Sequence, residues 1–314
     1  MDTPDPNHRK NSYPISTGDI VRVILATLLV MIGGFTLVAL LTVSGVLTGG
    51  EAPTVEDVES WAEGGITSLP TGLKITSMIV QAALIIPVLI FLRNRKLSPR
   101  IFLRAQPVPK SLLIFSVMVG FGVAVLGDEV DRLIAMVLPM TESLYEGVQS
   151  AMAIHSLTDF LTMGLTIALI APVVEELIFR GFFQRYFEAT KGVTAGVLAA
   201  SALFAAYHFN IYWLIPILLM ATVMGAMAWR AESVLPSIVV HATNNITGLI
   251  AGNVWGAEEP AWYGLGGHVS PWMLILAGLM LFLGLRWFFS TAETLGLGGH
   301  GPGGVSGSHL DTSV

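Results

Sequence analysis

Long apolar runs separated by short polar segments make up most of the chain, and their lengths predict membrane-spanning helices. A helix needs roughly 17 to 25 mostly apolar residues to cross a bilayer. Eight segments fit this pattern, at residues 20–47, 73–92, 111–128, from about 157 onward, 194–209, 212–229, 234–252 and 271–289. The sequence therefore predicts an all-α, polytopic membrane helix bundle of about eight transmembrane helices.

Composition agrees with this fold class. Of 314 residues, 53% are hydrophobic and 12% are charged, whereas a soluble domain carries about 25% charged residues. The net charge of -6 and the short basic clusters argue against a nucleic-acid partner. The chain has no cysteine, which excludes disulfides, thiolate catalysis and cysteine-bound metals. The first apolar run is too long for a signal peptide and is expected to stay as a membrane helix.

The charges of the connecting segments predict the orientation of the bundle. Residues 93–110 carry six basic residues and no acid, whereas residues 48–72 carry five acids and no base. Lysine and arginine mark the cytoplasmic side of a membrane protein. Alternation along an even number of spans then predicts that both termini lie in the cytoplasm.

The same pattern divides the chain into five parts. They are a cytoplasmic N-terminal tail (1–19), N-terminal membrane helices with their outer loops (20–154), a core with the charged motifs (155–252), an outer loop with the last membrane helix (253–290) and a disordered glycine-rich tail (291–314). Within the second part, an apolar patch at 133–140 and an amphipathic stretch at 144–154 predict one or two helices at the outer interface.

The segment Ala171–Arg185, APVVEELIFRGFFQR, places two acids and two bases in an apolar helix. An ionisable side chain near the bilayer centre costs about 3 kcal/mol on insertion scales, so such residues tend to be paired and functional. Glu176 and Arg180 are four residues apart and share one helix face, which predicts an ion pair. Glu175 lies about 100° around the helix and needs a different partner.

The helix that carries this segment is predicted to be unusually long. Ser156 and Asp159 fit a capping box, and the apolar run continues to about Phe187. Its length of roughly 48 Å exceeds a hydrocarbon core of about 30 Å. Pro172 is the one strong breaker, so we expect a bend or a local opening just before the carboxylates.

Two further polar pairs recur at helical spacing. Phe204 and His208 are four residues apart near the end of the fifth predicted helix, and His241 and Asn245 are four apart in the seventh. Each pair therefore projects from one helix face.

A depth estimate relates the two histidines to Glu175. A turn near residues 190–192 makes the fourth and fifth helices an antiparallel hairpin, which brings Glu175 and His208 to nearly the same depth, about 24 Å from the turn. His241 lies about 12 Å beyond the turn near Glu232. It matches less well unless the fourth helix projects into the cytoplasm.

These residue types suit hydrolysis. A buried carboxylate beside an imidazole can act as a general base toward water. A second histidine with an asparagine amide can stabilise an oxyanion. Two imidazoles and a carboxylate are equally a catalytic zinc set, although the HExxH motif is absent. From the residues alone, both a metal-free and a metal-dependent site are open.

Three motifs in order, EExxxR at 175–180, FxxxH at 204–208 and HxxxN at 241–245, resemble the CPBP family of CAAX prenyl endopeptidases and bacteriocin-processing or immunity proteins. The resemblance covers residues 155–252, which are then the CPBP-like catalytic core. It implies a multi-pass intramembrane endopeptidase of a bacterial inner (plasma) membrane. Its site would open toward the cytoplasm and accept a peptide or protein substrate.

The resemblance also implies roles for individual residues. Glu175 and His208 would activate the water, and His241 and Asn245 would stabilise the oxyanion. The supporting residues would be Glu176, Arg180 and Phe204. If a divalent cation such as zinc is bound, its ligands would be Glu175, His208 and His241.

Two other classes of function remain open. Intramembrane ionisable groups also mark the paths of proton-coupled transporters, although here the carboxylates are adjacent in one helix rather than spread over several. A non-proteolytic membrane scaffold or bacteriocin-immunity protein could use the same polar cluster only to stabilise its fold.

Overall fold

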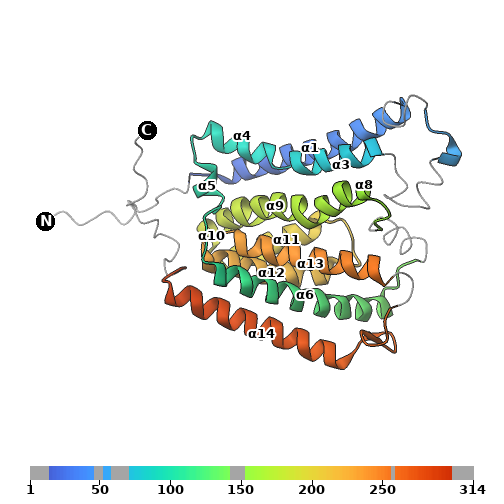
Figure 1. Ribbon diagram of the computed structural model, residues 1–314. Helices are drawn as coiled ribbons and strands as arrows, with labels where there is room; N and C mark the ends of the chain where they lie inside the picture. The colour runs from blue at the N-terminus through green and yellow to red at the C-terminus, as the bar shows by residue number, and fades with distance from the viewer. Residues whose placement is uncertain (1–13, 46–51, 58–70, 142–152, 256–258, 299–314) are drawn as a thin grey trace.

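The computed structural model describes residues 14–45, 52–57, 71–141, 153–255 and 259–298, and shows a bundle of roughly parallel and antiparallel helices (Figure 1). Within these residues, six helices are long and apolar enough to cross a membrane: α1 (Thr17–Val43), α3 with α4 (Thr71–Ala83 and Ile86–Asn94), α6 (Lys110–Val137), a composite helix (Leu157–Lys191), α12 (Leu214–Ala231) and α14 (Pro271–Thr294). The predicted all-α, polytopic membrane bundle is confirmed.

The remaining two predicted spans are also helical. α11 (Val193–Tyr207) has 15 residues, and α13 (Leu235–Val254) has 20. Neither is among the six long apolar helices, because α11 is short and α13 carries His241 and three asparagines. All eight predicted segments are thus helices, of which six have the length and hydropathy of a span.

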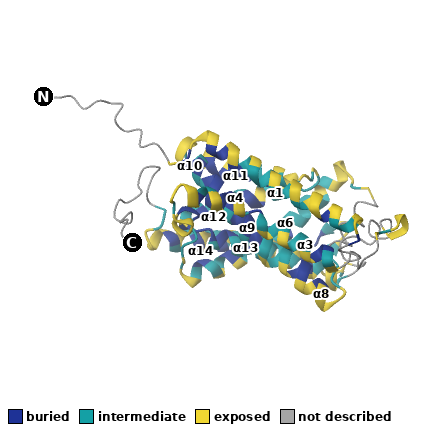
Figure 2. Ribbon diagram, turned by 90° about the horizontal axis from the view of Figure 1, so that it is seen from above, coloured by how far each residue is buried: buried dark blue, intermediate teal, exposed yellow. Residues whose placement is uncertain are grey.

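The helices form layers (Figure 1). The hairpin of α1, α3 and α4 lies along one face, the composite helix lies next to it, and α6 and α14 lie at the opposite side. Buried residues concentrate around the middle helices of the bundle, including α12 and α13 (Figure 2). The composite helix is therefore flanked by protein on both sides, which makes room for buried polar groups.

Small residues bring α6 close to its neighbours. A Cβ added to Gly120 would lie 2.8 Å from the carbonyl oxygen of Val240 in α13, and one added to Gly122 would lie 2.7 Å from that of Ala277 in α14. Without a hydrophobic driving force between helices in lipid, such close backbone packing is a main source of association.

α6 also corrects one prediction. It continues without a break to Val137, so residues 133–137 belong to the long helix rather than to a separate interfacial one. The amphipathic stretch predicted at 144–154 lies almost entirely outside the described residues.

One end of the bundle carries the basic connection and the short helix α5 (Pro99–Phe102). Here Arg95 donates to Asp19 at 2.7 Å, which joins the end of α4 to the start of α1. Arg230 at the end of α12 donates to the carbonyl of Leu297 after α14. The described chain therefore begins and ends at the same end of the bundle, as expected for an even number of crossings.

The opposite end carries the two-stranded hairpin of β1 (Gly264–Leu265) and β2 (His268–Val269). Tyr263 donates to Asp128 at 2.9 Å, and burial together with this carboxylate raises the pKa of Tyr263. Its ring packs against Trp255 and Trp262. Clustered tryptophan and tyrosine side chains are typical of a membrane–water interface.

Candidate active site

The composite helix Leu157–Lys191 carries the charged segment. The side chain of Ser156 accepts a hydrogen bond from the amide of Asp159, so the helix begins where the capping pair predicts. Along its length it alternates between α-helical and π-helical turns: α8 (Leu157–Asp159), η1 (Phe160–Gly164), η2 (Thr166–Ile170), α9 (Ala171–Glu176), η3 (Leu177–Gln184) and α10 (Arg185–Lys191). Local π-helical turns are frequent at functional sites.

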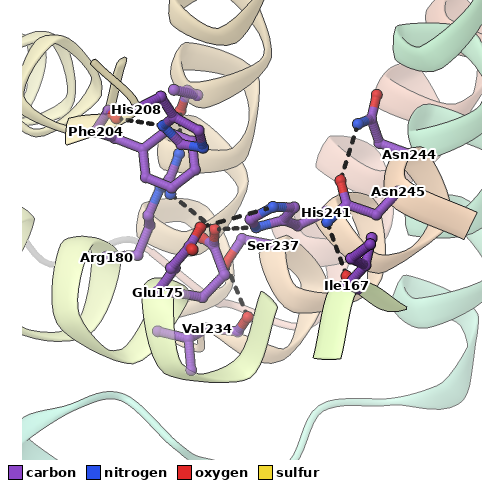
Figure 3. A network of polar contacts seen from close by, with 12 residues as sticks. Ile167, Glu175, Arg180, Phe204, His208, Val234, Ser237, His241, Asn244 and Asn245 are labelled. Atoms are coloured by element: carbon purple, nitrogen blue, oxygen red, sulfur yellow. Dashed lines mark hydrogen bonds and ion pairs between the residues drawn. The ribbon is translucent and has the colours of Figure 1, made fainter. Parts of the chain in front are cut away.

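Pro172 interrupts the backbone bonding of this helix just before the glutamates. The amide of Ala171 bonds to Thr166, five residues back, so the next bond in the series would need an N–H on residue 172. Proline has none. The carbonyl left over is that of Ile167, and it accepts a hydrogen bond of 2.9 Å from the side-chain Nδ2 of Asn245 (Figure 3). The local opening predicted at Pro172 is therefore present, and the side chain of Asn245 from α13 hydrogen-bonds to the carbonyl that it leaves.

Glu176 and Arg180 form the predicted ion pair, and neither side chain is exposed to solvent. Arg180 Nη1 donates to Glu176 Oε1 at 2.8 Å, and Nη2 donates to the carbonyl of Ala221 in α12 at 3.2 Å. The guanidinium also lies 4.3 Å from the centre of the Phe204 ring. These contacts hold both charges and tie the composite helix to α11 and α12.

Both ring nitrogens of His241 lie near a glutamate carboxylate, and the ring points toward Glu175 (Figure 3). Its Nδ1 is 3.0 Å from Glu176 Oε1, and its Nε2 is 3.9 Å from Glu175 Oε2. Because an ionised carboxylate only accepts hydrogen bonds, Nδ1 carries the hydrogen, and the tautomer is fixed by Glu176. Nε2 is thereby turned toward Glu175.

Glu175 is only 7% exposed, yet it is not part of the Glu176–Arg180 pair. Its Oε1 accepts a hydrogen bond of 2.9 Å from Gln81 Nε2 of α3. The 3.9 Å between its Oε2 and His241 Nε2 is too long for a hydrogen bond. It is short enough for one water molecule to hydrogen-bond to both atoms.

Glu175 also faces a cavity of about 220 Å³, bounded by α1, the end of α3, the composite helix and α11. Among the residues that line it, Glu175 is the one charged side chain, and most of the others are aliphatic or aromatic. A buried acid at the wall of an apolar cavity is the arrangement expected of a binding or catalytic site.

His208 hydrogen-bonds to the backbone of its own helix, α11. Its Nδ1 lies 2.9 Å from the carbonyl of Phe204, and the two rings pack at 4.8 Å. The ring of His241 also packs against Phe204, with 5.6 Å between the ring centres. Glu175 and His208, both within the described residues, share no hydrogen bond. The histidine with a ring nitrogen within 4 Å of Glu175 is His241, at 3.9 Å.

The position of the turn before α13 explains how His241 reaches the depth of the glutamates. The amide of Val234 donates to the carbonyl of Arg104 at 3.0 Å, and Arg104 pairs with Glu188 at 2.5 Å. The backbone of Leu103, next to Arg104, packs on Gly181, where an added Cβ would lie 2.8 Å from the Leu103 carbonyl oxygen. This turn thus lies near the level of Gly181, and the composite helix continues past it to Lys191. The condition for His241 to reach the glutamates is therefore met.

The donors suggested for a metal are not gathered into a ligand set. No group of three or more His, Cys, Asp or Glu side chains within the described residues could hold a metal ion. Nδ1 of His208 and Nδ1 of His241 are both taken up by protein oxygens. These hydrogen bonds leave Nε2 of each histidine as a possible donor atom. Because no ligand set is assembled among the described residues, we derive no step through a metal.

The sequence reasoning missed two features. Gln81 belongs to no motif, and its contact with Glu175 depends on how α3 packs. Gln184 and Glu188 continue the four-residue spacing of Glu176 and Arg180, which was a usable signal. Gln184 Nε2 donates to Glu188 at 2.7 Å and to the carbonyl of Gly225 in α12 at 2.8 Å.

The fold and the site define a polytopic membrane protein with a buried carboxylate–histidine–arginine network between its helices. Residues 157–247 match the family model described as type II CAAX prenyl endopeptidase Rce1-like, and this segment contains all three motifs. The match confirms the resemblance to the CPBP family. It supports a membrane-embedded protease with a peptide or protein substrate. Neither the curated proteins nor the solved structures contain a match to the chain.

Proposed function

We propose that the protein is an intramembrane endopeptidase that hydrolyses a peptide bond by water activated at Glu175. The observation that carries this proposal is the placement of Glu175: a nearly buried carboxylate at an apolar cavity, 3.9 Å from a histidine that a second glutamate orients. A carboxylate with a purely structural role is expected to be paired with a cation, as Glu176 is with Arg180. Glu175 is not part of that pair.

In the proposed reaction, Glu175 accepts a proton from the water while the water oxygen attacks the carbonyl carbon of the substrate. The proton then passes from Glu175 to the amide nitrogen. The C–N bond breaks, releasing an acid and an amine. Glu176 and Arg180 hold the composite helix and His241 in place throughout.

The hydrogen bonds of the two histidines support the roles implied by the family. With its Nδ1 hydrogen given to the Phe204 carbonyl, a neutral His208 presents the lone pair of Nε2, which can accept from the water. His241 stands between two carboxylates, which stabilise the ring when Nε2 also carries a proton. It then donates to the developing oxyanion together with the second N–H of the Asn245 amide.

The chemistry of the cavity bears on the substrate. An apolar wall with one buried acid suits a peptide bearing an apolar group next to the bond that is cut. The matched family is named for prenyl endopeptidase activity. A peptide with a farnesylated cysteine followed by three residues is therefore the first substrate to test, with the unprenylated peptide beside it.

Glu175→Gln tests the proposal directly. In purified protein, cleavage of a quenched fluorescent version of this peptide should fall about a hundredfold or more, the range of a lost general base. Thermal melting should be unchanged. Glu293→Gln, at an exposed position of α14, is the matched control and should behave as the wild type.

The outcomes separate the competing functions. Activity that persists in Glu175→Gln would refute the assignment. A second outcome is that the wild type cleaves neither peptide and that no peptide accumulates in a strain that carries Glu175→Gln. That result would favour a scaffold, an immunity protein or a proton-coupled transporter over an endopeptidase. The location in a bacterial inner membrane belongs to the same proposal and follows from the family resemblance.

Metal dependence has its own measurement. Because the ligand set is not assembled, we expect elemental analysis of protein purified without a histidine tag to find less than stoichiometric zinc, and activity to survive a chelator. Stoichiometric metal that is lost together with activity would show that the three donors rearrange around an ion.

A further inference from the structure

Gln81 is the one side chain outside residues 157–247 that hydrogen-bonds to Glu175 within the described structure. It comes from α3, in the part of the chain that no family motif covers. Its Nε2 donates to Glu175 Oε1 at 2.9 Å, and the contact joins residues 94 positions apart. The N-terminal hairpin thus reaches the carboxylate proposed as the base.

A break in the hairpin helix aims Gln81 at the site. α3 ends at Ala83, and α4 starts at Ile86 with Pro87 in its first turn, which has no N–H to continue the earlier helix. Leu84, in the break, is 2% exposed and lines the same cavity as Glu175. The last turn of α3 therefore supplies the polar contact, and the break after it supplies part of the apolar wall.

The contact decides which carboxylate oxygen faces His241. The terminal torsion of a glutamate is broad, so an unrestrained carboxylate rotates easily. Gln81 occupies Oε1, while Oε2 is the oxygen 3.9 Å from His241 Nε2. The hydrogen bond from Gln81 to Oε1 thus keeps Oε2 turned toward His241 Nε2, where a water molecule would bind.

We propose that Gln81 is a positioning residue that orients Glu175 for water activation. The proposal rests on the proposed endopeptidase function. It also gives the N-terminal hairpin a part in catalysis, because the site in residues 157–247 is incomplete without α3.

A second tie between the same elements provides a control. Lys74, seven residues earlier on α3, pairs with Asp159 of the composite helix at 2.5 Å, and both side chains are buried. This ion pair holds the hairpin against the core without touching Glu175. If Gln81 only docked the hairpin, loss of either tie should have the same effect.

The test compares Gln81→Met, which keeps the length of the side chain without its donor, with the double variant Lys74→Met, Asp159→Asn. With the farnesylated peptide as probe, Gln81→Met should lower kcat at least tenfold while KM stays within twofold and the melting temperature is unchanged. The double variant should lower the melting temperature and keep kcat within about threefold of the wild type.

Gln81→Met with wild-type kcat would overturn the proposal, as would equal losses of stability and activity in both variants. Gln81→Asn, which keeps the amide but is one methylene shorter, should fall between Gln81→Met and the wild type. Failure of the endopeptidase function itself would be recognised separately, because the wild type would then be inactive or Glu175→Gln would retain activity.

Discussion

At the residue scale, the two adjacent glutamates differ in what satisfies them. Glu176 has a cation and a histidine within hydrogen-bonding distance and is fully buried. Glu175 accepts a hydrogen bond from a neutral amide, and the nearest histidine nitrogen is 3.9 Å away. A carboxylate kept from a strong ion pair in a buried site retains the ability to accept a proton, and this difference supports Glu175 as the proposed base.

The Glu176–Arg180 pair leads to a prediction about stability. Arg180→Met should destabilise the protein by about 3–5 kcal/mol, because it leaves the buried Glu176 carboxylate without its cation. The double variant Glu176→Gln, Arg180→Met removes both charges and should recover much of that loss. Thermal melting in detergent measures both effects. Equal destabilisation in the single and double variants would show that packing around Phe204, and not charge, holds this region.

At the scale of elements, the helical period was enough to predict which motif residues share a face. The pairing of Glu176 with Arg180 and the opening at Pro172 followed from spacing and from the missing N–H of proline. The partner that fills the opening, Asn245, could not be predicted, because it lies 78 residues away on another helix.

The depth of residues along the bundle was harder to predict than the helix face on which they lie. The count of residues from each turn brought His241 level with the glutamates only if the fourth predicted helix projects into the cytoplasm. The composite helix extends past the turn before α13, so His241 reaches both glutamates although the count placed it too near the end. The hairpin contact of Gln81 was out of reach for a related reason: it depends on the lateral packing of α3, which a single sequence does not encode in any local pattern.

At the scale of the whole molecule, the site lies between two unlike parts. Residues 157–247 carry the family motifs. α1 and Leu84, just after α3, supply one wall of the cavity, and Gln81 of α3 contacts Glu175. The wall from α1 also contains Thr27, whose hydroxyl is buried without a hydrogen-bond partner. Variation in this hairpin would therefore change which substrates fit while leaving the motifs intact.

The orientation of the whole bundle is the last prediction, and the chain is well suited to test it because it contains no cysteine. Single cysteines at Lys96, in the basic connection, and at Glu56, in the acidic one, are both exposed positions. Lysine and arginine clusters stay on the cytoplasmic side. A membrane-impermeant maleimide added to cells whose cytoplasmic membrane is intact and accessible should therefore label Glu56→Cys and not Lys96→Cys, and both should react after permeabilisation.

The same measurement places the site relative to the membrane. Arg185, less than three helical turns beyond Glu175, donates to the carbonyls of Ile101 and Phe102 in the basic connection. If Lys96→Cys is shielded in intact cells, Glu175 lies nearer the cytoplasmic face, and substrates should be cut there. The reverse labelling pattern would put the site near the outer face and would contradict a cytoplasmic substrate.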